Sequence, residues 1–135
     1  MLAPFTRQAW GNETWLLCAD HGAWYTLESL TKSGYMDTVN AFIDPGRQSP
    51  DPTYLLLWAF SSNHRDTDKL SFRMTEEEIA AGHRLPRSFL RKIPTGAAFQ
   101  EVELSLLRLL QEAGLITFSG PGEADEARPI DPPPQ

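Results

Sequence analysis

Basic side chains gather in one short segment of this chain, His83-Arg84-Leu85-Pro86-Arg87-Ser88-Phe89-Leu90-Arg91-Lys92. The segment holds four of the chain's 12 Lys and Arg residues, one histidine and no acid. Arg84, Arg87 and Arg91 are three and four residues apart, which places them on one face of a helix. Guanidinium groups arranged in this way suit phosphates or the carboxylates of a protein surface. A second interpretation is a solvated face paired with the neighbouring acids Glu76, Glu77 and Glu78.

Other residues offer weaker candidate sites. His64, Asp66 and Asp68 share one polar turn, but a cation site of oxygen ligands needs more ligands and a turn glycine, so a solvated turn is favoured. Cys18 lies in an apolar run and is interpreted as a small buried hydrophobe rather than a reactive thiol. The sequence has no paired cysteines for zinc, no glycine-rich phosphate loop and no Gly-x-Ser-x-Gly turn. We therefore predict no catalytic residue, no cofactor and no metal ligand.

The length and charge of the chain limit the kinds of partner. One domain is expected for 135 residues. The net charge is −6, from 18 acids and 12 bases; the stretch from Ser119 onward has four acids and one base, which leaves 14 acids against 11 bases before it. An acidic body does not attract nucleic acid in general, so any contact with DNA would need the local basic segment.

The sequence favours a cytoplasmic protein without a membrane segment. A single cysteine cannot form an internal disulfide, so nothing indicates an oxidising compartment. The N-terminal residues lack the continuous apolar core of a signal peptide. The longest apolar run, Tyr54 to Phe60, is far too short to cross a bilayer.

The first half of the chain predicts a hairpin followed by two helices. The apolar runs Trp15 to Ala19 and Ala23 to Leu27 flank Asp20-His21-Gly22, which is typical of a β-hairpin turn. Helical spacing around Val39 to Ile43 ends at Pro45-Gly46. Asp51-Pro52 is typical of a helix start, with the aspartate as cap and the proline in the first turn. The helix that follows, from Thr53 to about Ser61, is apolar on nearly all sides and is expected in the middle of the fold.

The second half predicts short elements and one longer helix. Alternation over Leu70, Phe72 and Met74 indicates a half-buried strand. Thr75-Glu76-Glu77-Glu78 is a capping box that opens a short helix, closed by Gly82. A second short helix is expected from Leu85 to Ile93. A longer helix, from about Phe99 to Ala113, ends at Gly114 and has the core stripe Phe99, Val102, Leu106, Leu109, Leu110 and Ala113.

Leu104 lies off that stripe, either exposed or in contact with a partner, and we include it among the candidate binding residues. Leu115 to Phe118 indicates a closing strand. The sequence thus predicts a single α+β domain over residues 1–118, with an N-terminal β-hairpin followed by a small helical part with short strands. Residues 119–135 form an acidic, Pro-rich tail that cannot bury enough apolar surface to fold alone, so it is expected to be disordered or docked.

Three patterns follow one another between Leu70 and Phe118. They are Thr75-Glu76-Glu77-Glu78-Ile79-Ala80, then Leu85-Pro86-Arg87-Ser88-Phe89-Leu90-Arg91-Lys92, then Leu106-Leu107-Arg108-Leu109-Leu110-Gln111-Glu112-Ala113-Gly114-Leu115-Ile116. With these residues the stretch resembles a winged helix-turn-helix domain of transcription regulators and of plasmid or phage replication proteins. The resemblance implies a supporting helix, a recognition helix and a lead into the wing, in that order, with Thr53 to Phe60 as the leading helix. It also implies that the residues facing DNA are Arg87, Ser88, Arg91 and Lys92.

The chain departs from that family where Pro94-Thr95-Gly96 separates the second pattern from an additional helix. Some domains of the family have lost DNA binding and serve as protein-interaction modules, which suits an acidic chain. The leading hypothesis is therefore a non-catalytic regulatory or inhibitory accessory protein, of a phage or plasmid type, with another protein as the favoured partner. One alternative is a winged-helix DNA-binding regulator or replication factor that uses the Arg84 to Lys92 face. Another is a small enzyme whose site converges from separated residues.

Overall fold

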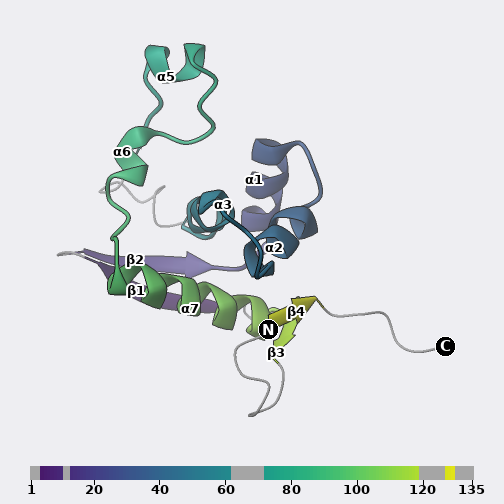
Figure 1. Cartoon of the computed structure of the whole chain (residues 1–135). Helices are drawn as coiled ribbons and strands as arrows, with labels where there is room; N and C mark the ends of the chain where they lie inside the picture. Colours follow the sequence, from purple (N-terminus) through teal and green to yellow (C-terminus); the bar gives the residue numbers. More distant parts are fainter. Residues whose placement is uncertain (1–3, 11–12, 62–71, 119–126, 130–135) are drawn as a thin grey trace.

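The fold is an α+β arrangement with an antiparallel β-hairpin at its N-terminal end, as predicted. The computed structural model describes residues 4–10, 13–61, 72–118 and 127–129. Figure 1 shows the hairpin and the longest helix on one side of the central helices. The elements, in chain order, are β1 (Phe5–Trp10), β2 (Glu13–Cys18), α1 (His21–Thr31), α2 (Tyr35–Ile43), α3 (Asp51–Phe60), α5 (Glu76–Ala80), α6 (Arg87–Leu90), α7 (Ala97–Glu112), β3 (Ile116–Phe118) and β4 (Ala127–Pro129).

The hairpin lies nearer the N-terminus than the sequence predicted. β1 pairs with β2 in antiparallel register, from Phe5 opposite Cys18 to Trp10 opposite Glu13. The predicted second strand, Ala23 to Leu27, is wrong, because these residues belong to α1. The reason is Asp20, whose Oδ1 accepts a hydrogen bond from the Ala23 backbone N–H at 2.8 Å. The aspartate thus caps a helix and does not begin a hairpin turn.

Helix α3 occupies the centre of the fold, as its apolar sequence predicted. Its buried side chains come from nearly all sides of the helix. It packs against α1, α2, β2 and α7. The start differs in detail from the prediction: Asp51 is already helical, Pro50 is the N-cap residue, and no side chain caps the helix. Helix α2 ends at Ile43, ahead of Pro45-Gly46, as predicted.

Helix α7 lies along the hairpin (Figure 1) and buries its predicted stripe. Val102, Leu106, Leu109 and Leu110 are buried, and Phe99 and Ala113 are partly buried against the core. Gly114 follows the helix with a φ of +79°, a left-handed conformation that glycine adopts without strain.

A polar cluster connects the start of α3 to α7 and to the loop before α3. The Thr53 hydroxyl donates to Glu103 Oε2 at 2.9 Å and accepts from Arg47 Nη1 at 3.0 Å. Arg47 also forms an ion pair with Glu103. Because Thr53 is fully buried, these bonds satisfy a hydroxyl that would otherwise lie unpaired in the core.

Two predictions about the second half need revision. Phe72 to Met74, predicted as part of a strand, is not in a strand, and Leu70 lies outside the described residues. Phe72 instead packs its ring on Trp15 and Phe89, with centroid distances of 5.8 and 5.4 Å. Aromatic packing, not strand pairing, thus fixes this segment.

The predicted closing strand is present as β3, and it pairs with residues of the predicted tail. β4 runs antiparallel to β3, with Ile116 opposite Pro129 and Phe118 opposite Ala127. The remainder of the predicted tail lies outside the described residues. Among the helices that the structure describes, none is long and apolar enough to span a membrane.

Candidate functional site

The basic segment found in the sequence, His83 to Lys92, follows the short helix α5 and includes the short helix α6. We call residues 75–91 the arm. Figure 1 shows the arm projecting from the rest of the molecule, with α5 at its far end. The candidate site is therefore built from the arm and the residues just before it.

The capping box at the start of α5 forms as predicted. Thr75 Oγ1 accepts from the Glu78 backbone N–H at 3.1 Å, and Glu78 Oε1 accepts from the Thr75 backbone N–H at 3.1 Å. After Ala81, Gly82 adopts a φ of +79° and turns the chain away from the helix, also as predicted. A helix of only five residues therefore has both ends defined by local interactions.

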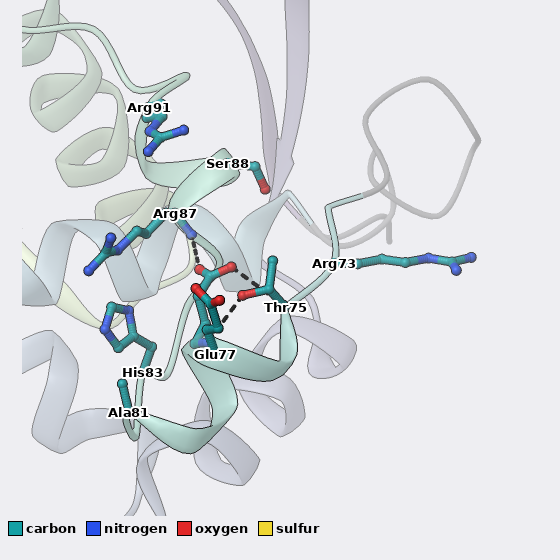
Figure 2. A pocket seen from close by; sticks show the side chains of 9 residues that line it. Arg73, Thr75, Glu77, Ala81, His83, Arg87, Ser88 and Arg91 are labelled. Carbon is teal, nitrogen blue, oxygen red and sulfur yellow. Dashed lines mark hydrogen bonds between the residues drawn. The ribbon is translucent and has the colours of Figure 1, made fainter.

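Glu78 has a second role that the sequence did not reveal. Its other carboxylate oxygen, Oε2, accepts from the backbone N–H of Arg87 at 2.5 Å, so one side chain connects the starts of α5 and α6. Figure 2 shows these bonds as dashed lines. The N–H of Arg87, and next that of Thr75, hold the pKa of the Glu78 carboxyl below its ordinary value, because both bonds favour the charged form.

The two helices of the arm are attached to the body in different ways. α6 is anchored by Phe89, which is fully buried and packs on Trp15 and Trp58 with centroid distances of 5.6 and 4.9 Å. α5 buries only Glu78, and Ile79 at its surface is 63% exposed. The bond from Glu78 to α6 is thus the main link that positions α5.

A cavity of ≈ 510 Å³ lies where the arm meets the segment before it. Basic and hydroxyl side chains predominate among its polar lining, and the acids are Glu77 and Glu78. Figure 2 shows Arg87 and His83 extending to one side and Arg73 to the opposite side. The lining residues are Arg73, Thr75, Glu77, Glu78, Ala81, His83, Arg87, Ser88 and Arg91.

The structure divides the predicted basic face. Helix α6 covers only Arg87–Leu90, so the predicted helix from Leu85 to Ile93 is too long. Arg87, Ser88 and Arg91 line the same cavity. Arg84 precedes the helix and lines a smaller neighbouring hollow of ≈ 150 Å³, beside Asp51 and Tyr54. The reason is Pro86, which caps α6 in an extended conformation and excludes the residues before it from the helix.

The interpretation that the arginines pair with the acids of α5 does not describe the observed contacts. Glu78 is engaged by backbone N–H groups. Within the part of the chain that the structure describes, the guanidinium groups of Arg84, Arg87 and Arg91 form no ion pair. All three side chains are exposed, and their charges face solvent.

The other candidate residues lie apart from this cavity. Lys92 is exposed just beyond α6, and Leu104 is 52% exposed on α7. Cys18 donates to Asp20 Oδ2 at 3.6 Å; burial, and then the Asp20 carboxylate, raise the pKa of its thiol. A raised pKa disfavours the reactive thiolate. The proposed cation turn at His64, Asp66 and Asp68 lies outside the described residues, and the described ones contain no cluster of three His, Cys, Asp or Glu suited to a metal.

Sequence reasoning missed Arg73 and Glu77 as lining residues. Arg73 was assigned to a strand, and Glu77 was treated only as part of a capping box. No sequence signal placed either beside Arg87, since only the fold of the arm brings them together. Comparison with known proteins found no matching family, no matching curated protein and no matching solved structure.

Proposed function

We propose that this chain is a non-catalytic regulatory protein that binds a carboxylate-rich surface of a partner protein through the arm. The observation that supports this most is that Arg87 and Arg91, both exposed and without an ion pair among the described residues, lie with Ser88 around one cavity. Two guanidinium groups and a hydroxyl provide several donors and a positive charge, which matches carboxylates in geometry and in sign.

A protein partner fits the charge of the molecule better than a nucleic acid does. The chain has a net charge of −6, exposed Glu76 and Glu77 lie on α5, and Glu77 lines the same cavity as Arg87 and Arg91. Carboxylates at this place would repel the continuous phosphates of a duplex. A protein surface can offer acids to the arginines and bases to Glu76 and Glu77 at the same time.

A second candidate function is DNA binding by a winged helix. The observation that favours it is the order of a capped helix, a turn with Gly82 and a second helix that exposes Arg87 and Ser88, with Arg91 exposed at its C-terminal end. Against it, α6 is four residues long, which gives a recognition helix of about one turn. A protein partner is therefore favoured over DNA.

Fluorescence anisotropy tests both candidates with two labelled probes, an oligoglutamate peptide and a random-sequence DNA duplex. Each is titrated with the protein at low salt and again near physiological salt. We expect the peptide to bind, and the Arg87→Ala/Arg91→Ala double variant to bind it about tenfold more weakly, since loss of charge-assisted bonds worth about 1.4 kcal/mol lowers affinity tenfold. Arg108→Ala is the matched control, because Arg108 is an exposed arginine on α7 that does not line the cavity.

The outcomes separate the two candidates. Binding of the duplex that falls steeply with salt and is lost in the double variant would favour the DNA-binding function, because each neutralised phosphate releases counterions. Equal loss in the double variant and in Arg108→Ala would indicate general electrostatic attraction and would contradict the arm as the site. If neither probe binds at low salt, the arm is not an anion-binding surface and both candidates fail.

A further inference from the structure

A second concave surface differs chemically from the cavity at the arm, because it is lined mainly by aromatic and apolar side chains. Its cavity volume is ≈ 450 Å³, and α1, the start of α2 and the end of α7 contribute to it. We call it the aromatic groove. The residues that matter here are Trp24, Tyr25, Tyr35, Pro4 and Leu115.

The aromatic groove has firmly positioned walls. The Trp24 ring stacks on Tyr35 with centroids 4.8 Å apart and meets Phe60 of the core edge-on at 5.3 Å. Glu28 Oε2 accepts a hydrogen bond from the Tyr35 backbone N–H at 3.0 Å, which connects α1 to the start of α2. Tyr25 is 74% exposed, so a large aromatic surface is available at this place without any rearrangement.

Strand β4, which precedes the proline run in the sequence, ends near residues that line this groove. β4 ends at Pro129, which pairs with Ile116 in antiparallel register. Leu115 directly precedes Ile116, the first residue of β3, and it lines the aromatic groove. β4 also contacts α2, the helix that begins at Tyr35. Pro129, the last residue of β4, therefore pairs with the residue next to Leu115 of the groove.

Those following residues have the composition that aromatic grooves bind. Their sequence is Ile130-Asp131-Pro132-Pro133-Pro134-Gln135, and they lie outside the described residues. Consecutive prolines favour the polyproline II conformation, which loses little entropy on docking between aromatic rings. At about 3.1 Å per residue, six residues in this conformation reach about 19 Å from the end of β4.

The lining of the groove also includes a side chain that can donate a hydrogen bond, since Trp24 carries an indole N–H. Carbonyl oxygens in a polyproline II segment have no internal partners, so they are available to an indole N–H. Proteins that recognise proline-rich chains commonly do so with aromatic surfaces and a hydrogen-bond donor.

We propose that Pro132 to Pro134 of this chain's own tail dock in the aromatic groove. The short connection from β4 makes the docking intramolecular, with an effective concentration on the order of millimolar, so weak contacts suffice. The tail then covers Tyr25 and the exposed edge of Trp24. This docking is independent of the arm and of the function proposed for it.

Two-dimensional ¹H–¹⁵N NMR of the full chain tests the docking. In the Pro132→Gly/Pro133→Gly/Pro134→Gly variant we expect the indole signal of Trp24 and the amide signals of Tyr25 and Tyr35 to shift. The indole signal of Trp58, which packs on Phe89, serves as an internal control and should stay in place. The matched control variant, Glu123→Gly/Ala124→Gly/Asp125→Gly, adds three glycines upstream of β4 and should leave the groove signals unchanged.

Two additions complete the experiment. The free peptide Ile-Asp-Pro-Pro-Pro-Gln, titrated into the triple proline variant, should return the groove signals toward their parental positions. Tyr25→Ala should remove contacts between proline and aromatic protons without altering the fold, because Tyr25 is exposed. If the triple proline variant leaves the groove signals unmoved, the tail does not dock there. If the parental groove signals change with protein concentration, the occupant is the tail of a second copy, which would also overturn the proposal.

Discussion

Helices α3 and α5 are both short, yet they are held in place by opposite means. α3 buries six of its ten residues, and nearly all of these are apolar. α5 buries one of its five residues, and that residue is a glutamate. The first helix is fixed by apolar surface removed from water, and the second by hydrogen bonds to a single carboxylate.

This difference explains how the molecule presents a binding surface. A helix that is fixed by apolar packing buries most of its surface in the core, so few of its side chains are exposed to a partner. A helix that is fixed by one polar link leaves its remaining side chains at the surface, as Ile79 and Glu77 are here. The cost is dependence on that one link, so the arm should open under conditions that leave the body folded.

The largest loss of stability should come from removing core volume that α3 itself supplies. Phe60 is fully buried and meets Trp24 edge-on. Phe60→Ala removes a large side chain and leaves a cavity, so we expect the free energy of unfolding to fall by about 3–5 kcal/mol. Chemical denaturation followed by tryptophan fluorescence measures the change. A loss of less than about 1 kcal/mol would mean that the core around α3 is not closely packed, and the contrast with α5 would disappear.

A smaller and more local effect should follow from removing the carboxylate of Glu78. In Glu78→Ala the backbone N–H groups of Thr75 and Arg87 lose their acceptor. We expect amide hydrogen exchange at Arg87 to become much faster while the unfolding transition of the body changes little. Glu77→Ala is the matched control, because Glu77 is the exposed neighbour on the same helix. Equal exchange rates in both variants would show that Glu78 does not hold the arm.

The same link should depend on pH in a defined direction. The folded arm lowers the pKa of Glu78, chiefly through the N–H of Arg87, so the unfolded arm binds the proton more tightly. The stabilisation is therefore fully present above the ordinary carboxyl pKa of about 4.3 and is lost as the pH falls through the lower folded value. The chemical shift of the Arg87 amide should follow a titration with its midpoint below about 4.3. In Glu78→Gln this titration should vanish, and a midpoint at the ordinary value would contradict the bonded arrangement.

Sequence patterns predicted those elements whose signals are local. The capping box at Thr75, the stop at Gly114 and the apolar stripe of α7 each depend on residues within one or two turns, and all three are present. The predicted hairpin was misplaced, because Asp20-His21-Gly22 suits a turn as well as a helix start. In the structure Asp20 caps α1, and Ala23 and Leu27, four residues apart on that helix, are both buried.

The candidate site was predictable only in part, for a related reason. Arg87, Ser88 and Arg91 are close in sequence, and they do lie together. The bond from Glu78 to the Arg87 N–H spans nine residues across a turn, and no residue pattern specifies such a contact. Arg84 lies three residues before Arg87, which is helical spacing, but α6 begins only after Pro86. The spacing therefore predicted a helical face shared by Arg84 and Arg87 that the chain does not form.

The smallest change in the free energy of unfolding should come from replacing the apolar residue at the surface of α5. Ile79 is 63% exposed, so Ile79→Ser removes almost no buried surface, and we expect the free energy of unfolding to change by no more than about 0.5 kcal/mol. Denaturation curves of this variant and of Leu104→Ser, a second exposed apolar residue, should overlie the parental curve. A loss above about 1 kcal/mol for Ile79→Ser alone would mean that α5 packs its apolar side on the body in solution. In that case the arm would be held by apolar contacts as α3 is, and Glu78 would no longer be the link that sets its position.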